Sequence, residues 1–249
     1  TEASPDITAT VSPMAHVTDD VVQDLLAQDM VDRQAGGRTV DFLLQYVVRE
    51  ISSEHKRQVV AIEAIRLQIC FHEDRSVSVP AREALQKLLS NLDCIYVFGV
   101  NSGVTTGGGV HWGTAVLDPG RHSFIVINTL SVSHRLSTKT VAASKDVLQL
   151  LIETGNFAGG LRLTVYHTCP QPEGWECSYQ SGCVVLFILR DRVLFSKLAL
   201  GHKDFAALIT KRVNNPSCGR DFRSKLAETL LVCCNCNLVI NDRGQTCQH

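Results

Sequence analysis

Four residues between positions 111 and 177 could together hydrolyse an acyl bond. His111 is a candidate base and Cys177 a candidate nucleophile, with Asn128 and Gln171 between them. A thiol attacks as its thiolate, so it needs a neighbour that lowers its pKa, usually an imidazole and often a helix N-terminus. The imidazole needs a carboxylate or amide on its far nitrogen, and the oxyanion needs an N–H donor. The residue types therefore point to a cysteine hydrolase, in which Asn128 orients His111 and Gln171 stabilises the oxyanion.

The elements that must position these residues are a hairpin and a helix. Residues 110–117 and 123–127 read as strands joined by a turn at 118–121, so His111 begins the hairpin and Asn128 follows its end. The apolar run 184–189 predicts a buried helix leaving the cysteine segment. The hairpin would bring His111 and the Asn128 amide together, and the helix would position the Cys177 thiol.

The remaining pattern predicts an α+β fold, with helices first and a central, mostly antiparallel sheet flanked by helices. Two further strands are expected at 94–100 and 161–167. The apolar residues of 58–71 fit both the helical and the strand period, and 192–200 could be strand or helix. The predicted helices are 21–26, 40–48, 80–89 (with proline in the first turn), 141–153, 205–212 and 221–231.

Composition indicates a globular protein without a strong electrostatic field. The chain has 249 residues, 45% of them apolar, and 24 basic residues balance 25 acidic ones. We therefore expect one catalytic domain over 19–231, between a flexible lead-in (1–18) and a cysteine-rich tail (232–249). The balance argues against nucleic-acid or membrane partners, and we expect a monomer.

The cysteines and the N-terminal residues bear on the compartment. Ten cysteines cluster late in the chain, without the spacing of a disulfide-stapled secreted domain, and residues 1–20 show no signal-peptide pattern. We expect reduced thiols and an intracellular protein of the cytoplasm or nucleus, whether resident there or delivered into a host cell as an effector.

The order of the short motifs resembles that of the SUMO and ubiquitin-like protein proteases related to the adenoviral protease. That family has His-Trp, two strands ending in Asp-Ser-Leu, then Pro-Gln and a cysteine motif before an apolar helix. Here the separations are 17 residues from His111 to Asn128 (128 − 111) and 49 from Asn128 to Cys177 (177 − 128). The resemblance covers residues 20–200. The matching runs are His111-Trp112, Ile127-Asn128-Thr129-Leu130, Pro170-Gln171 and Glu173-Gly174-Trp175-Glu176-Cys177-Ser178.

The resemblance implies the papain-like fold of that family and a protease that cleaves after the Gly-Gly terminus of SUMO, ubiquitin or a relative, without cofactor or metal. It makes Cys177 the nucleophile, His111 the base, Asn128 the orienting residue and Gln171 the oxyanion donor. Trp112 and Trp175 would bind substrate, with Trp112 forming a wall of the tunnel that admits a Gly-Gly tail.

This sequence departs from the family at three places. Asn128 stands where the family has aspartate, and Ser178 where it has glycine. The Trp-Leu-Asn-Asp signature of the first helix is missing, with residues 30–33 its nearest counterpart. These departures favour one alternative, an inactive pseudo-protease that binds a modifier. A second alternative is an acyltransferase on the same fold, for which a carboxylate at position 128 would be usual.

Two further assignments stay open at the level of sequence. Cys183 competes with Cys177 because the apolar run after it resembles the family's post-cysteine helix, although the spacing from Gln171 favours Cys177. In the tail, Cys233, Cys234 and Cys236 with Cys247 and His249 are soft ligands that could hold zinc, but the usual Cys-x2-Cys pair is missing, so no metal is predicted.

Overall fold

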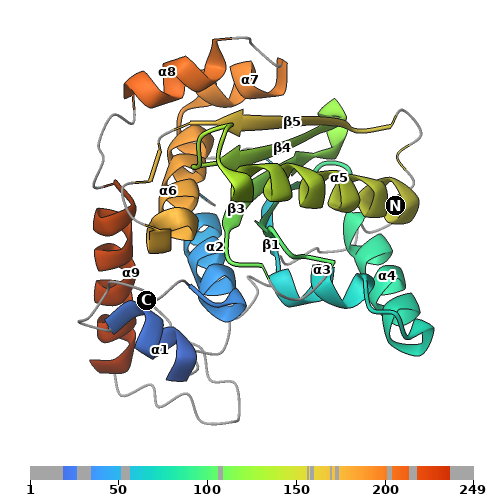
Figure 1. Ribbon diagram of the computed structural model, residues 1–249, viewed down its shortest axis with the longest axis horizontal. Coiled ribbons are helices and arrows are strands. Elements are labelled where there is room, and N and C mark those ends of the chain that lie inside the picture. The colour runs from blue at the N-terminus through green and yellow to red at the C-terminus, as the bar shows by residue number, and fades with distance from the viewer. Residues whose placement is uncertain are drawn as a thin grey trace, which may run out of the picture.

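A five-stranded mixed sheet forms the centre of the molecule (Figure 1). The computed structural model describes residues 19–26, 35–51, 57–105, 109–155, 157, 160–168, 170–171, 174–200, 204–212 and 218–235. The predicted lead-in 1–18, residues 30–33 and tail residues 236–249 lie outside this set. The strands are β1 (Val59–Ile62), β2 (Ile95–Asn101), β3 (Trp112–Asp118), β4 (Ser123–Asn128) and β5 (Arg162–His167).

The strands lie in sequence order across the sheet. β2, β3 and β4 pair antiparallel, and β3 and β4 form the predicted hairpin through a short 3₁₀ turn at Pro119–Arg121. The prediction of an antiparallel sheet holds for these central pairings, whereas β1 pairs with β2, and β4 with β5, in parallel. Parallel pairs need long crossover connections, and these are supplied by helices.

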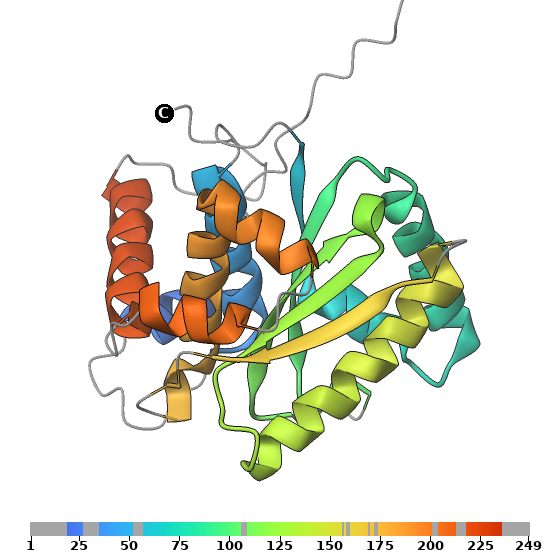
Figure 2. The ribbon, with the colours of Figure 1, turned by 90° about the horizontal axis from the view of Figure 1, so that it is seen from above.

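Both faces of the sheet are covered, as Figure 2 shows from above. Every residue of β2 is buried, and its side chains alternate between two apolar clusters. Ile95 and Val97 belong to one cluster, and Tyr96 and Phe98 to the other. A continuous apolar run such as 95–100 is what a strand covered on both faces requires.

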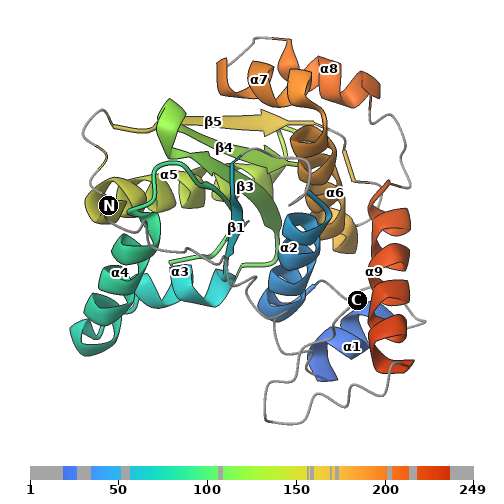
Figure 3. The same cartoon turned by 180° about the vertical axis from the view of Figure 1, so that it is seen from behind.

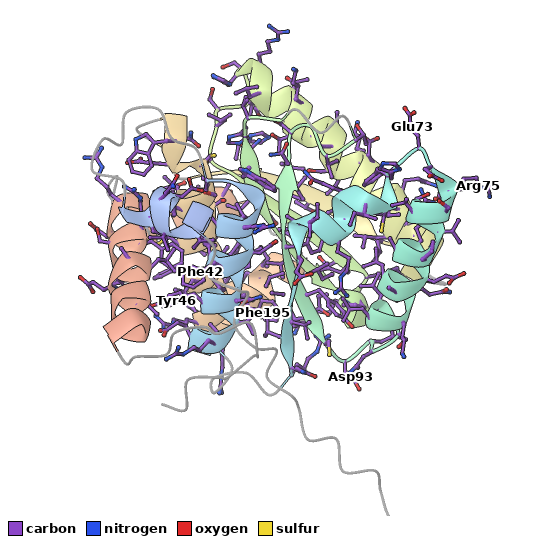
Figure 4. The ribbon with its side chains drawn as sticks, turned by 90° about the horizontal axis from the view of Figure 1, so that it is seen from below. Phe42, Tyr46, Glu73, Arg75, Asp93 and Phe195 are labelled. Atoms are coloured by element: carbon purple, nitrogen blue, oxygen red, sulfur yellow. The ribbon has the colours of Figure 1, made fainter. Side chains whose placement is uncertain are left out.

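The helices divide between the two faces (Figure 3). The helical half containing the first cluster holds Phe42, Tyr46 and Phe195, whereas Glu73 and Arg75 lie at the opposite edge of the molecule (Figure 4). The helices on the first side are α1 (Asp19–Leu26), α2 (Gly37–Ile51), α6 (Cys177–Arg190), α7 (Arg192–Leu200), α8 (Phe205–Arg212) and α9 (Cys218–Asn235). Those on the other side are α3 (Ala64–Cys70), α4 (Arg75–Leu89) and α5 (Arg135–Gly155).

The structure confirms the predicted helices and moves several of their boundaries. α4 begins before the predicted start at Pro80, because Asp74 Oδ1 accepts a hydrogen bond of 2.8 Å from the Ser76 N–H and caps the helix, so Pro80 lies inside it rather than in its first turn. α5 begins at Arg135 rather than 141, since its first turns are polar and carry no apolar period. The ambiguous 58–71 contains β1 followed by α3, and 192–200 is helical.

The predicted boundary at 231/232 falls inside α9, which continues to Asn235. Within the part of the chain that the structure describes, no helix combines the length and apolarity needed to cross a membrane.

Helix α6, which begins at the candidate nucleophile, is held close to α2. A Cβ at Gly182 would lie 2.5 Å from Leu43 Cδ2, so only glycine allows this approach without moving Leu43. The other side of α6 packs on β3 and α9, and most of its residues are buried. The position of Cys177 is therefore fixed by the core rather than by a loop.

Asp41 of α2 is a buried carboxyl group that ties α2 to the start of α3. Its Oδ1 accepts a hydrogen bond of 2.6 Å from the N–H of Ala64, the first residue of α3. Burial raises the pKa of Asp41 from 3.8 to about 7, against the opposing effect of this bond. Because the folded state holds the proton more tightly than the unfolded chain, this group lowers stability progressively as the pH rises from about 4 to about 7.

Asp41→Asn should therefore stabilise the protein increasingly with pH. The amide oxygen can still accept from Ala64, and no charge is buried. At about 1.4 kcal/mol per pKa unit, the gain in unfolding free energy should grow by about 2 kcal/mol between about pH 5.5 and 8.5. Urea unfolding at the two pH values measures it, with the exposed Asp146→Asn as control. A gain that does not change with pH would contradict the buried-charge argument.

Candidate active site

The hairpin of β3 and β4 brings His111 and Asn128 together. Thr114 pairs with Ile127, so the residues just before Thr114 lie beside those just after Ile127. His111 Nε2 is 3.0 Å from Asn128 Oδ1, and both side chains are buried. The structure thus places two of the predicted site residues in direct contact.

The hydrogen bonds of Asn128 fix the tautomer of His111. The N–H of Leu130 can only donate, and it lies 3.1 Å from the same Oδ1 atom, which identifies that atom as the amide oxygen. An oxygen acceptor requires His111 Nε2 to carry its proton. Nδ1 of the neutral ring is then the acceptor, which is the state that a general base needs.

The other end of the Asn128 amide reaches α5 and β5. Nδ2 donates to Ser137 Oγ at 3.1 Å, and Ser137 Oγ is 3.3 Å from His167 Nδ1. His167 Nδ1 is also 3.1 Å from the carbonyl oxygen of Leu130. Sequence reasoning did not identify Ser137 or His167 as part of the site. Their only signal would have been the parallel pairing of Asn128 with His167, which places both residues at the same end of the sheet.

Burial lowers the pKa of His111 from its ordinary value of 6.5. The hydrogen bond with Asn128 opposes this effect, and the nearby His134 adds to it. The neutral imidazole is therefore the resting form at neutral pH.

Cys177 is the first residue of α6 and is 0% exposed. Burial raises the pKa of its thiol to about 11, although hydrogen bonds from the backbone N–H groups of Trp112, Ser178 and Cys177 itself oppose the effect. The contact with the Trp112 N–H places the sulfur beside the backbone of the residue that follows His111. The positive end of the α6 dipole also favours a thiolate at this position.

Gln171 is anchored to the loop that follows β4. Its backbone N–H donates to Thr129 O at 3.1 Å, and its side-chain Oε1 accepts from Thr129 Oγ1 at 2.6 Å. Nε2 donates to the carbonyl oxygen of Gly174 at 3.2 Å, three residues before Cys177. These bonds connect the amide of Gln171 to the turn that leads into the nucleophile.

Both candidate substrate-binding tryptophans are largely covered. Trp112 donates from Nε1 to Ala35 O at 3.1 Å, and its ring lies against Gly99, where an added Cβ would be 3.1 Å from ring carbons. Trp175 is 5% exposed and lies beneath the guanidinium of Arg223, at 5.4 Å from its ring centroid. Each ring is therefore held in a fixed orientation by groups outside the catalytic residues.

Cys183 lies on a different side of α6 from Cys177. The two residues are six positions apart, and at 3.6 residues per turn their side chains point about 120° apart around the helix axis. Cys183 is partly exposed and faces α9, and its pKa is lowered, first by a hydrogen bond with the Cys218 side chain. These contacts point away from β3 and favour Cys177 over Cys183 as the partner of His111.

Within the described residues, no group of three or more histidine, cysteine or acidic side chains is arranged to hold a metal ion. Three of the tail residues for which sequence left a zinc site open lie outside this set. They are Cys236, Cys247 and His249.

Comparison with known proteins shows similarity in fold. A structure described as the de-sumoylating protease has a TM-score of 0.57 at 13% identity, and the match covers 89% of this chain and 91% of that one. The SUMO protease Ulp1 with its catalytic cysteine oxidised to a sulfonic acid has a TM-score of 0.54 at 13% identity, and the match covers 89% of this chain and 88% of that one. The form of Ulp1 oxidised to a sulfinic acid has a TM-score of 0.52 at 14% identity, and the match covers 87% of this chain and 86% of that one. No protein-family model matches the chain, and no curated protein matches it in sequence.

The chain therefore has the fold of the SUMO proteases. This confirms the fold class predicted from the order of the His-Trp, strand and cysteine motifs. The match covers 89% of this chain and 91% of that one, so the likeness extends over most of both folds.

The two candidate nucleophiles should differ in their reactivity toward a small alkylating reagent. Because Cys177 is buried with a raised pKa and Cys183 is partly exposed with a lowered one, iodoacetamide at about pH 7.5 should modify Cys183 at least about tenfold faster. Peptide mapping by mass spectrometry measures both rates, and urea-unfolded protein, in which the rates should converge, is the control. Faster modification of Cys177 in the folded protein would contradict the closed geometry.

Proposed function

We propose that the protein is a cysteine protease that cleaves after the Gly-Gly terminus of SUMO, ubiquitin or a related modifier. The observation that carries the proposal is the bond from His111 Nε2 to Asn128 Oδ1, because it leaves Nδ1 as the acceptor that a general base needs. The next residue, Trp112, donates its backbone N–H to the Cys177 thiol. The fold shared with SUMO proteases supports the substrate class.

In the proposed reaction, the Cys177 proton moves to His111 Nδ1 as the sulfur bonds to the scissile carbonyl carbon. The oxyanion that forms accepts hydrogen bonds from the Cys177 N–H and from the side-chain amide of Gln171. Collapse breaks the C–N bond, and His111 protonates the leaving amine. Water then attacks the thioester, gives its proton to His111 and releases the modifier carboxylate and the free thiol.

Asn128 orients His111 in this proposal but stabilises its charged form less than a carboxylate would. Trp112 and Trp175 border the channel for the Gly-Gly tail. The catalytic domain, extended to Asn235 at the end of α9, acts as a monomer in the cytoplasm or nucleus and requires no cofactor.

The burial of Cys177 favours a second candidate, a pseudo-protease that binds a modifier without cleaving it. Ser178, in place of a glycine, has a buried hydroxyl with no hydrogen-bond partner among the described residues. The residue before Cys177 is also unusual, since the fully buried Glu176 pairs through Oε1 with Arg220 at 3.1 Å. Both features tighten the surroundings of the thiol and would hinder its access to a substrate.

A covalent probe separates the two candidates. SUMO and ubiquitin carrying a vinyl sulfone at the C-terminal glycine should each be tested for an adduct, mapped by mass spectrometry. If the protein is a protease, the probe forms an adduct on Cys177. Cys177→Ala should then abolish the adduct and lower turnover of the modifier substrate at least about 10³-fold. Cys183→Ala, on the same helix, is the matched control and should keep both the adduct on Cys177 and the turnover. Binding without an adduct would establish the pseudo-protease instead.

The pH profile of kcat/KM reports the two key groups. Activity requires neutral His111, so it is lost as the pH falls through a pKa that lies below 6.5. The Cys177 pKa of about 11 predicts no alkaline loss up to about pH 9.5. Asn128→Asp should raise the His111 pKa by adding a negative charge, moving the acid limb to higher pH. An acid limb that does not move would mean that position 128 does not contact the base during turnover.

A further inference from the structure

An asparagine at the orienting position creates a problem that an aspartate does not have. A carboxylate offers an oxygen whichever way it is turned, whereas the two ends of an amide differ. If Asn128 were reversed, its NH₂ group would face His111 Nε2 and require that nitrogen to be the acceptor. The proton would then reside on Nδ1, and the nitrogen needed as the base would be blocked.

The structure contains a hydrogen-bond chain that holds the amide in the productive orientation. Asn128 Nδ2 donates to Ser137 Oγ at 3.1 Å, and Ser137 is 1% exposed, so water does not compete for this contact. A hydroxyl can also donate, and would then suit a reversed amide. As an acceptor, Ser137 Oγ therefore acts together with the Leu130 N–H to hold Asn128 in the observed orientation.

His167 favours the acceptor role of Ser137 Oγ. The carbonyl of Leu130 can only accept, so His167 Nδ1, at 3.1 Å from it, carries a proton. The same N–H lies 3.3 Å from Ser137 Oγ, which makes the serine oxygen an acceptor from both His167 and Asn128. Leu130 closes the chain, because its own N–H donates to Asn128 Oδ1 at 3.1 Å.

We propose that Ser137 is a positioning residue that holds the amide oxygen of Asn128 toward His111, with His167 keeping the serine hydroxyl an acceptor. This rests on the proposed function for its catalytic consequence, but the tautomer that it sets is a property of the folded protein. It explains how asparagine can stand where the similar proteases have a carboxylate. A carboxylate at 128 would make the restraint unnecessary.

The test is a double-mutant cycle between positions 137 and 128. Ser137→Ala should lower kcat on a Gly-Gly-terminated modifier at least about tenfold with KM changed less than about twofold, because only the base is impaired. In the Asn128→Asp background, the same change should cost less than about threefold. An equal loss in both backgrounds would overturn the proposal.

Matched variants separate positioning from packing. Ser144→Ala removes another fully buried hydroxyl of α5, whose Oγ donates to Thr140 O at 2.7 Å, and it should leave kcat unchanged. Ser137→Thr keeps the hydroxyl and should retain activity. Should Ser137→Ala fail to fold, His167→Leu decides: a loss of kcat that Asn128→Asp restores supports the proposal, and one that it does not restore overturns it.

A readout without turnover distinguishes this proposal from the proposed function. The ¹⁵N chemical shifts of His111 report its tautomer, and in Cys177→Ala protein the Nε2–H form should dominate. Adding Ser137→Ala should bring up the Nδ1–H form, whereas adding Ser144→Ala should not. If the wild-type protein has no protease activity but Ser137→Ala still shifts the His111 tautomer, the proposed protease function is wrong and the positioning role of Ser137 stands. An unchanged tautomer would overturn the positioning role, whatever the activity.

Discussion

The hydrogen bond between His111 Nε2 and Asn128 Oδ1 is the constraint around which the rest of the molecule is arranged. It joins the beginning of β3 to the end of β4 in a place that water does not reach, and there each donor must meet an acceptor. β3 and β4 must keep their register, α5 must bring Ser137 to the amide, and β5 must end beside β4. A shift of one residue in any of these pairings would separate the imidazole from its partner.

The thiol is placed by a different principle. Cys177 takes its position from α6, which approaches α2 at Gly182 and is covered by β3 on another side. The core thus delivers the sulfur with little freedom, but the same burial raises its pKa and opposes the thiolate. The helix dipole and the surrounding N–H groups offset part of that cost. The reactivity of the Cys177 thiol therefore depends on the balance between its burial and these opposing groups.

The sequence predicted the parts whose signal is local. The apolar runs 94–100 and 123–127 predict strands because they suit a sheet covered on both faces. His111, Asn128, Gln171 and Cys177 were selected by residue type, order and spacing, and the structure brings His111 and Asn128 into contact. Their catalytic roles stay predictions. Ser137 could not be selected, because the polar first turns of α5 hide the start of that helix. His167 acquires its partners only through the parallel pairing of β5, which no short motif encodes.

That parallel pairing also bears on how the protein folds. The strands with His111 and Asn128 are neighbours in the chain and can pair as a local hairpin, which forms quickly. Ser137 is also close in the chain, nine residues after Asn128. His167 meets this group only after β5 has returned along the whole length of α5, and closing such non-local contacts is slow. His111, Asn128 and Ser137 are thus near neighbours in the chain, and His167 joins their hydrogen-bond chain from a distant segment. A partly folded chain could therefore hold His111 beside Asn128 before His167 reaches Ser137, so the β4–β5 crossover completes the hydrogen-bond chain last.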